Sequence, residues 1–191
     1  MGSAQKISSE ELFKAWREGI SDWGLKYYGK EGWEIEMSSD EITKGVICPY
    51  ILTHLSPRLG VRARFEIPLR WDGVKNKRMD VVLYDATYKN ALAHIEYENS
   101  YGHLLGEFSK FIHSEPKLKV MLTITDLSDK ESRQEFDEWF NNLFKPAIYN
   151  AIETNRDTIW TLVYSQTFDF SQWKGVKFEY KDGEVIKTGL S

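Results

Sequence analysis

The sequence contains a single cysteine, Cys48, so the chain cannot form an internal disulfide and a reducing compartment is expected. No apolar run approaches the roughly 20 residues that span a bilayer, and the most apolar stretch lies near Val120–Ile124. The first residues lack the apolar stretch of a secretory signal peptide. These absences predict a cytoplasmic protein with no membrane partner.

The chain also has no excess of basic residues, because 25 Lys and Arg stand against 29 Asp and Glu, which gives a formal net charge of -4. Any contact with nucleic acid must therefore come from a local patch. Repeats, low-complexity tracts and Pro/Gly-rich linkers are absent, which predicts one domain over residues 1–191. Aromatic residues are abundant, with 7 Trp, 10 Tyr and 10 Phe, as is typical of a globular domain with a large core.

The pattern in the first third of the chain predicts a helix at 8–23, a short strand at 33–37 and a second helix at 41–55. Ser8 and Glu11 have the spacing of a capping box at the start of the first helix. Pro49 is expected to bend the second helix or to mark its true start.

From residue 61 onward the spacing of the apolar residues along the chain is mostly typical of β-strands. The expected strands lie at 61–69, 79–84, 91–98, 118–125 and 158–164, followed by a terminal hairpin of 176–180 and 185–188. The hairpin turns at Asp182-Gly183. Helices are expected at 104–112 and 130–152, and Pro146 is expected to bend or break the second.

The element order over residues 41–125 is helix, strand, strand, strand, helix, strand. A strand–helix–strand step predicts a parallel crossover between 91–98 and 118–125. The expected fold class is therefore α/β, with a central mixed sheet flanked by helices.

Three carboxylates stand on two neighbouring predicted strands, Asp80 on the first and Glu96 and Glu98 on the second. Since side chains alternate along a strand, Glu96 and Glu98 share one face. Adjacent carboxylates repel each other unless a proton or a cation resolves the repulsion. If Asp80 lies alongside, three hard oxygen ligands converge, which suits Mg²⁺ or Mn²⁺. Such a site can activate water for phosphodiester hydrolysis.

The run Lys77-Arg-Met-Asp-Val-Val-Leu83, followed after Asp80 by 15 residues and then Glu96-Tyr-Glu98, resembles the core of the PD-(D/E)XK nuclease superfamily. The resemblance covers residues 41–125 and implies a restriction-endonuclease-like αβββαβ core. Residues 1–40 would then be an amino-terminal helical extension, and residues 126–191 would add a carboxy-terminal helix and strands.

The resemblance also implies the roles of the site residues. Asp80 and Glu96 would hold the metal, with the Tyr97 carbonyl as a further ligand. Glu98 stands where the family usually has lysine, so it can act as a base or as a ligand of a second metal but not as a cation. Lys110, on the following helix, is a candidate for the displaced positive charge. Asp80, Glu96 and Glu98 are therefore the predicted catalytic and metal-binding residues.

Other interpretations of these residues are open. Glu96 and Glu98 can belong to a solvated strand face, although the apolar residues around them favour an interior strand. His94 and His103 lie close by in sequence and make zinc conceivable, but no second histidine follows at helical spacing. A small-molecule enzyme has no Gly-rich phosphate loop to support it.

The leading hypothesis from sequence is a Mg²⁺- or Mn²⁺-dependent endonuclease that acts on DNA. The basic stretch from Lys75 to Arg78 supports it, because this stretch can contact phosphates. The alternative is a catalytically silent module of the same fold that binds nucleic acid or protein, as the missing lysine and the acidic net charge suggest. Cutting both strands of a duplex favours a homodimer, formed through the aromatic amino-terminal helix or the terminal hairpin.

Overall fold

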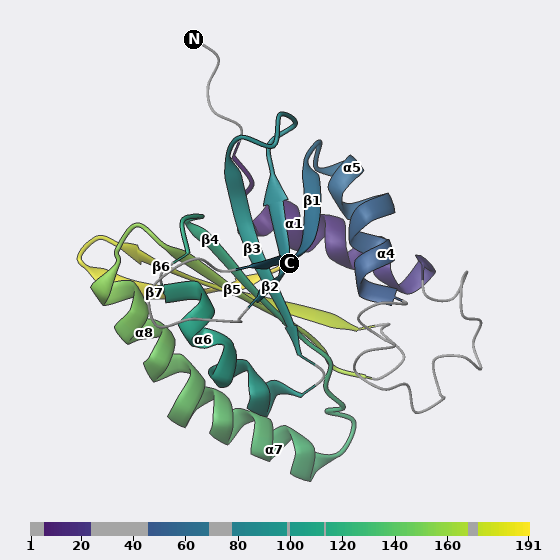
Figure 1. Ribbon diagram of the computed structural model, residues 1–191. Coiled ribbons are helices and arrows are strands. Elements are labelled where there is room, and N and C mark those ends of the chain that lie inside the picture. Colours follow the sequence, from purple (N-terminus) through teal and green to yellow (C-terminus); the bar gives the residue numbers. More distant parts are fainter. Residues whose placement is uncertain (1–5, 24–45, 69–77, 99, 113, 168–171) are drawn as a thin grey trace.

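In the part of the chain that the structure describes, seven strands form one sheet in which neighbours in the chain are also neighbours in space, from β1 to β7 (Figure 1). The strands are β1 (Arg62–Pro68), β2 (Arg78–Tyr84), β3 (Ala91–Glu98), β4 (Leu118–Thr123), β5 (Ile159–Ser165), β6 (Trp173–Lys181) and β7 (Glu184–Leu190). The central strands β3, β4 and β5 run parallel, and all other neighbours are antiparallel. The sheet is therefore mixed, and the predicted α/β fold class is confirmed.

The computed structural model describes residues 6–23, 46–68, 78–98, 100–112, 114–167 and 172–191, and it describes 66–68 and 78–79 by their backbone alone. Three predictions lie outside these residues: the strand at 33–37, the start of the second helix with Glu41, and the positions of Lys75 and Lys77. The remaining predicted strands are present, and Asp182 and Gly183 both have positive φ in the turn of the hairpin, as expected.

The helical segments are α1 (Ser9–Arg17), α4 (Cys48–Tyr50), η2 (Ile51–Leu55), α5 (Ser56–Arg58), η3 (Tyr101–His103), α6 (Leu104–Ile112), α7 (Lys130–Trp139), η4 (Phe140–Phe144) and α8 (Lys145–Thr154). The predicted capping box begins α1, since Ser8 Oγ accepts the Glu11 N–H at 3.1 Å and Glu11 Oε2 accepts the Ser8 N–H at 2.9 Å. In the described ranges, no helix has both the length and the apolar character needed to cross a membrane.

Prolines lie inside the helices without ending them. Pro146 is at the start of α8, directly after the π-helical turn η4, and Pro57 follows the π-helical η2 in the same way. A proline has no N–H to donate and its ring clashes with the carbonyl four residues earlier. The wider π turn moves that carbonyl away. The helix therefore continues from residue 130 to 154, and the break or bend expected at Pro146 takes the form of a π turn.

The helices cover the sheet on both faces (Figure 1). Side chains from α6, α7, η4 and α8 share one core with the sheet, in which Phe108 stacks on Trp160 at a centroid distance of 4.6 Å. Side chains of α1, α4 and η2 form the other core, in which Trp16 meets Tyr50 and Trp173 edge to face. Both crossovers of the parallel strands thus pass over one face, and the carboxylates of β3 lie at one end of that face.

The close packing of α1 on β6 gives a stability test. A Cβ on Gly175 would come within 2.8 Å of the ring of Phe13, which is only 1% exposed. We expect Gly175→Ala to lower the free energy of unfolding by about 1–3 kcal/mol, measured by urea denaturation. Gly189→Ala on the neighbouring strand is the control, because its Cβ would meet nothing within 4 Å. Equal stability of the two variants would contradict this packing.

Candidate functional site

The candidate site lies where β2 and β3 separate. The β2–β3 pairing begins at Val81 opposite Ile95, whereas β3 stays paired with β4 as far as Glu98. Beyond Val81 two carboxylates take the place of the backbone ladder. The Asp80 N–H donates to Glu96 Oε1 at 3.1 Å, and the Tyr97 N–H donates to Asp80 Oδ2 at 2.9 Å. These two bonds, one to Glu96 and one from its neighbour Tyr97, bring the predicted pair Asp80 and Glu96 together.

The helix α6 supplies the positive charge of the site. Lys110 Nζ donates to Glu96 Oε2 at 2.7 Å and also pairs with Glu107, one turn earlier in the helix. Glu96 is 0% exposed, and the side chain of Lys110 is only 12% exposed. Because charged hydrogen bonds gain strength away from water, this contact holds α6 on β3 at the position of the carboxylates.

Burial changes the proton affinity of these groups. It raises the pKa of Glu96 to about 9, and the charge of Asp80 adds to that effect. Burial likewise raises the pKa of Asp80 above its usual range. Burial alone would lower the pKa of Lys110, but the carboxylates of Glu96 and Glu107 outweigh it and raise that pKa to about 12. The site therefore keeps a cation at Lys110, while burial disfavours the charged form of its acids.

Glu98 lies at the open end of the site. Its pKa is raised by partial burial and then by the charges of Glu107 and Asp80. His103 Nδ1 lies 3.8 Å from Glu98 Oε2. The three predicted acids therefore belong to one electrostatic cluster with Glu107 and Lys110, which we call the acidic cluster. The side chain of Tyr97 points to the opposite face and is buried in the other core.

The structure does not show a ready-made metal site. Among the described residues, no three His, Cys, Asp or Glu side chains are already arranged as a ligand group. The two histidines of the zinc alternative have different neighbours, since His94 lies opposite Lys119 in the β3–β4 pair while His103 approaches Glu98. The acidic cluster is held together by Lys110 and by backbone N–H groups instead.

Two residues of this face were not expected from the sequence as parts of a site. Glu107 was visible only through its helical spacing to Lys110. Lys119 is 1% exposed on β4, and burial lowers its pKa to about 7. Its Nζ donates to the Ser114 carbonyl at 2.6 Å and to the Ser114 hydroxyl. Burial and the charge of Lys119 lower the pKa of His94 to about 3. The sequence signal that could have identified Lys119 as a buried charged group is its position within an otherwise apolar strand.

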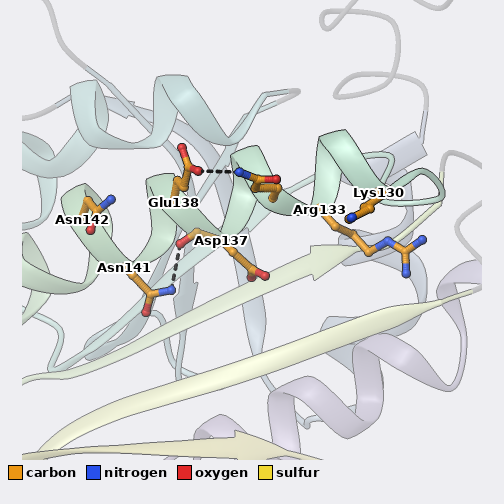
Figure 2. Close-up of a pocket in the computed structure, with 7 residues that line it drawn as sticks. Lys130, Arg133, Asp137, Glu138, Asn141 and Asn142 are labelled. Carbon is orange, nitrogen blue, oxygen red and sulfur yellow. Dashed lines mark hydrogen bonds between the residues drawn. The ribbon is translucent and has the colours of Figure 1, made fainter.

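A separate cavity of about 690 Å³ lies on the exposed side of α7 and η4. Figure 2 shows Lys130 and Arg133 at one end of it and Asn141 and Asn142 at the other. Several of its polar groups are already bonded within the helix, such as Asn141 Nδ2 to the Asp137 carbonyl at 2.8 Å. This cavity does not include any residue of the acidic cluster.

Comparison with family models, curated proteins and solved structures gave no match for this chain. The function must therefore be argued from the geometry and the charges of the site. Among the described residues, the acidic cluster combines burial, coupled titratable groups and a position at the carboxyl end of a parallel strand. Such a combination is typical of functional sites.

The buried Lys119 predicts a pH-dependent stability. Between pH 7 and 10.5 this lysine is neutral in the folded chain and protonated in the unfolded one. The unfolded state then binds more protons, so the unfolding free energy contributed by Lys119 rises with pH, by at most about 1.4 kcal/mol per pH unit. We expect urea denaturation to show Lys119→Met more stable than wild type at pH 7, with the difference shrinking as the pH rises.

The exposed Lys117 provides the control. The difference between Lys117→Met and wild type should stay constant over the same pH window. If the Lys119→Met and wild-type curves run parallel from pH 7 to 10.5, Lys119 does not have the lowered pKa.

Proposed function

We propose that this protein is a nuclease that hydrolyses phosphodiester bonds, in DNA, with the help of Mg²⁺ or Mn²⁺, on a restriction-endonuclease-like core. The observation that carries the proposal is the pairing of Asp80 and Glu96 across the separation of β2 and β3, with the cation Lys110 on Glu96. Two carboxylates and a lysine, buried together at the end of a parallel strand, are suited to stabilise a negatively charged transition state.

The residues of the acidic cluster fit an oxygen-preferring cation. All four of its acids offer carboxylate oxygens, the ligands that Mg²⁺ and Mn²⁺ prefer. Each carboxylate oxygen has two lone-pair directions, so Asp80 Oδ2 and Glu96 Oε1 can accept their N–H groups and still bind a metal. The raised pKa of Glu96 supports this fit, because a buried acid that must take a proton is one that a cation can stabilise instead.

A bound divalent ion would supply a water of lowered pKa and neutralise charge on the phosphate. Asp80 and Glu96 would hold that ion. Lys110 supplies the positive charge that the family's lysine would provide from the position of Glu98. Glu98, at the open end of the cluster with a raised pKa, is placed to accept a proton from the attacking water.

A second candidate function is a silent module of the same fold, which binds without cleavage. The observation in its favour is that Lys110 already neutralises Glu96 and Glu107, and that the described residues hold no preformed ligand group. Manganese separates the two candidates. A nuclease with this site is stabilised by the ion, by about 2.7 kcal/mol at 100 times the dissociation constant, whereas a silent module is not.

The homodimer stays a prediction, but only one of the two surfaces expected to form it is accessible. The aromatic side of α1 is not available, because Leu12 is 1% exposed and Trp16 is 0% exposed in the core of the chain's own fold. The terminal hairpin remains, since β7 pairs with β6 on one side and lies at the end of the strand order.

The catalytic prediction concerns the two cross-bonded acids. We expect Asp80→Asn and Glu96→Gln each to lower manganese-dependent cleavage of plasmid DNA by at least about 100-fold, because each removes a charged ligand while keeping the side-chain shape. Gel assays of supercoiled plasmid measure the cleavage. Thermal melting with manganese measures ion binding, and both variants should lose the stabilisation.

Asp157→Asn is the matched control, because Asp157 is an exposed acid paired with Lys117. It should cleave and respond to manganese like wild type. The nuclease proposal fails if wild-type protein cleaves no DNA or RNA with manganese and its melting temperature ignores divalent ions.

The position of Lys110 predicts opposite effects on catalysis and on ion binding. Lys110→Met removes the cation that stabilises charge, so we expect cleavage to fall by about 100-fold. It also removes the competitor at Glu96 Oε2, so half-maximal stabilisation should require less manganese. Lys174→Met, on the exposed surface of β6, should change neither quantity. Wild-type cleavage by Lys110→Met would show that this lysine has no part in the reaction.

A further inference from the structure

The same face of the sheet that carries the acidic cluster also carries two exposed arginines on β1. Arg64 lies opposite Val82 and Arg62 opposite Tyr84 in the antiparallel β1–β2 pair. Residues directly opposite each other in such a pair share a face, and Val82 is two residues from Asp80. Measured along the strand direction, the backbone of Arg64 is therefore roughly 7 Å from the level of Asp80.

Aromatic rings hold one of these arginines in place. The Arg64 guanidinium lies 4.6 Å from the ring centroid of Tyr88 and 5.6 Å from that of Tyr84. Tyr88 is 41% exposed and has a φ of 59°, which is unusual for a residue other than glycine. A cost in backbone energy at an exposed tyrosine points to a role outside the packing of the core.

The turn between β2 and β3 is built to present Tyr88. Asp85 Oδ1 accepts the N–H groups of Thr87 and Lys89, at 3.0 and 3.1 Å, and the Thr87 hydroxyl at 2.8 Å. The Tyr88 N–H donates to the Asp85 carbonyl at 3.1 Å. These bonds fix the turn, so the ring of Tyr88 is positioned before any ligand arrives.

A cavity of about 300 Å³ lies at the start of β1, between Arg62 and Tyr88 of this surface and residues of η2 and α5 on the opposite face of the sheet. Arg62 and Tyr88 line it together with apolar residues of η2 and α5, and Ser56 lies in its wall. Ser56 is only 3% exposed, and its hydroxyl oxygen has no hydrogen-bond partner among the described residues. An oxygen buried to this degree is not exposed to the cavity, so the cavity offers a ligand mainly its apolar wall.

In the described part of the chain, the charge of this surface has no counter-charge. No carboxylate among the described residues pairs with Arg62 or Arg64, whereas the exposed Arg58 nearby is paired with Glu18. In a chain whose net charge is -4, unpaired arginines on one strand form a local attraction for an anion.

We propose that Arg62, Arg64, Tyr84 and Tyr88, here called the arginine–tyrosine surface, bind single-stranded nucleic acid and lead it to the acidic cluster. The inference rests on the proposed function, to which it adds the substrate class. Arg62 and Arg64 contact phosphates, and an unpaired base stacks on Tyr88 at the mouth of the cavity.

Single strands fit this surface better than a duplex or an acidic peptide. Stacking on a side-chain ring and entry into a cavity both require a base that is not paired or stacked in a helix. An acidic peptide would satisfy the arginines but would leave the tyrosine ring and the cavity without a partner of matching shape.

The test measures binding of full-length protein to a fluorescent oligothymidylate of about 12 nucleotides by anisotropy, in a chelator. We expect Tyr88→Ala to weaken binding about tenfold. The double variant Arg62→Ala/Arg64→Ala should weaken binding further, and should reduce the slope of log affinity against log salt by about 0.7 per lost phosphate contact. Melting curves establish that each variant is folded.

Arg156→Ala is the matched control, because Arg156 also lies over a tyrosine ring, 4.4 Å from the centroid of Tyr180, in a different part of the sheet. It should bind like wild type. The proposal is overturned if the variants of the arginine–tyrosine surface bind like Arg156→Ala, if a duplex of the same length binds as tightly, or if polyglutamate competes as well as the oligonucleotide.

The chelator keeps this test separate from that of the nuclease proposal. Binding that depends on Arg62 and Arg64, in a protein that ignores manganese, overturns the nuclease proposal and leaves the arginine–tyrosine surface in place. If cleavage depends on Asp80 but binding is unaffected by loss of both arginines, the proposal for the arginine–tyrosine surface is overturned and the nuclease proposal stands.

Discussion

The interaction on which the site depends is the exchange of hydrogen bonds between Asp80 and the strand that carries Glu96. Where β2 leaves β3, backbone N–H groups lose their ladder partners, and a buried N–H without a partner is costly. Glu96 and Asp80 accept those N–H groups. The same bonds therefore end the β2–β3 pairing, satisfy the backbone and place two acids at the carboxyl end of β3. The burial that raises their pKa values follows from that position.

The acids and the arginines have opposite charges on one face of the sheet, and under the proposed function this arrangement would let an acidic protein attract a polyanion. The acidic cluster is partly screened by Lys110, while Arg62 and Arg64 remain exposed and unpaired among the described residues. Under the proposal, attraction and chemistry belong to different strands of the same sheet. The arginines on β1 would bind the strand of nucleic acid, and β3 would supply the reacting groups.

Much of the fold was predictable because apolar period and turn residues are local properties. The strand at Ala91–Glu98, the capping box of Ser8 and Glu11 and the turn at Asp182-Gly183 all follow from residues close together in sequence. The path of the helix through Pro146 was not predictable, because whether a proline breaks a helix depends on the preceding turn. Here that turn is π-helical, and packing of Phe140 and Phe144 against the sheet side supports it.

The sequence by itself determined that Asp80, Glu96 and Glu98 stand on neighbouring strands, because alternation and element order are properties of the chain. The sequence also offered Lys110 as the cation, but only the tertiary structure decided that Lys110 meets Glu96, through the crossover that lays α6 over β3. It also decided that Lys119 is buried and that Arg64 lies over Tyr88. Such contacts join residues far apart in sequence, and their energies depend on distance and burial, which no local pattern encodes.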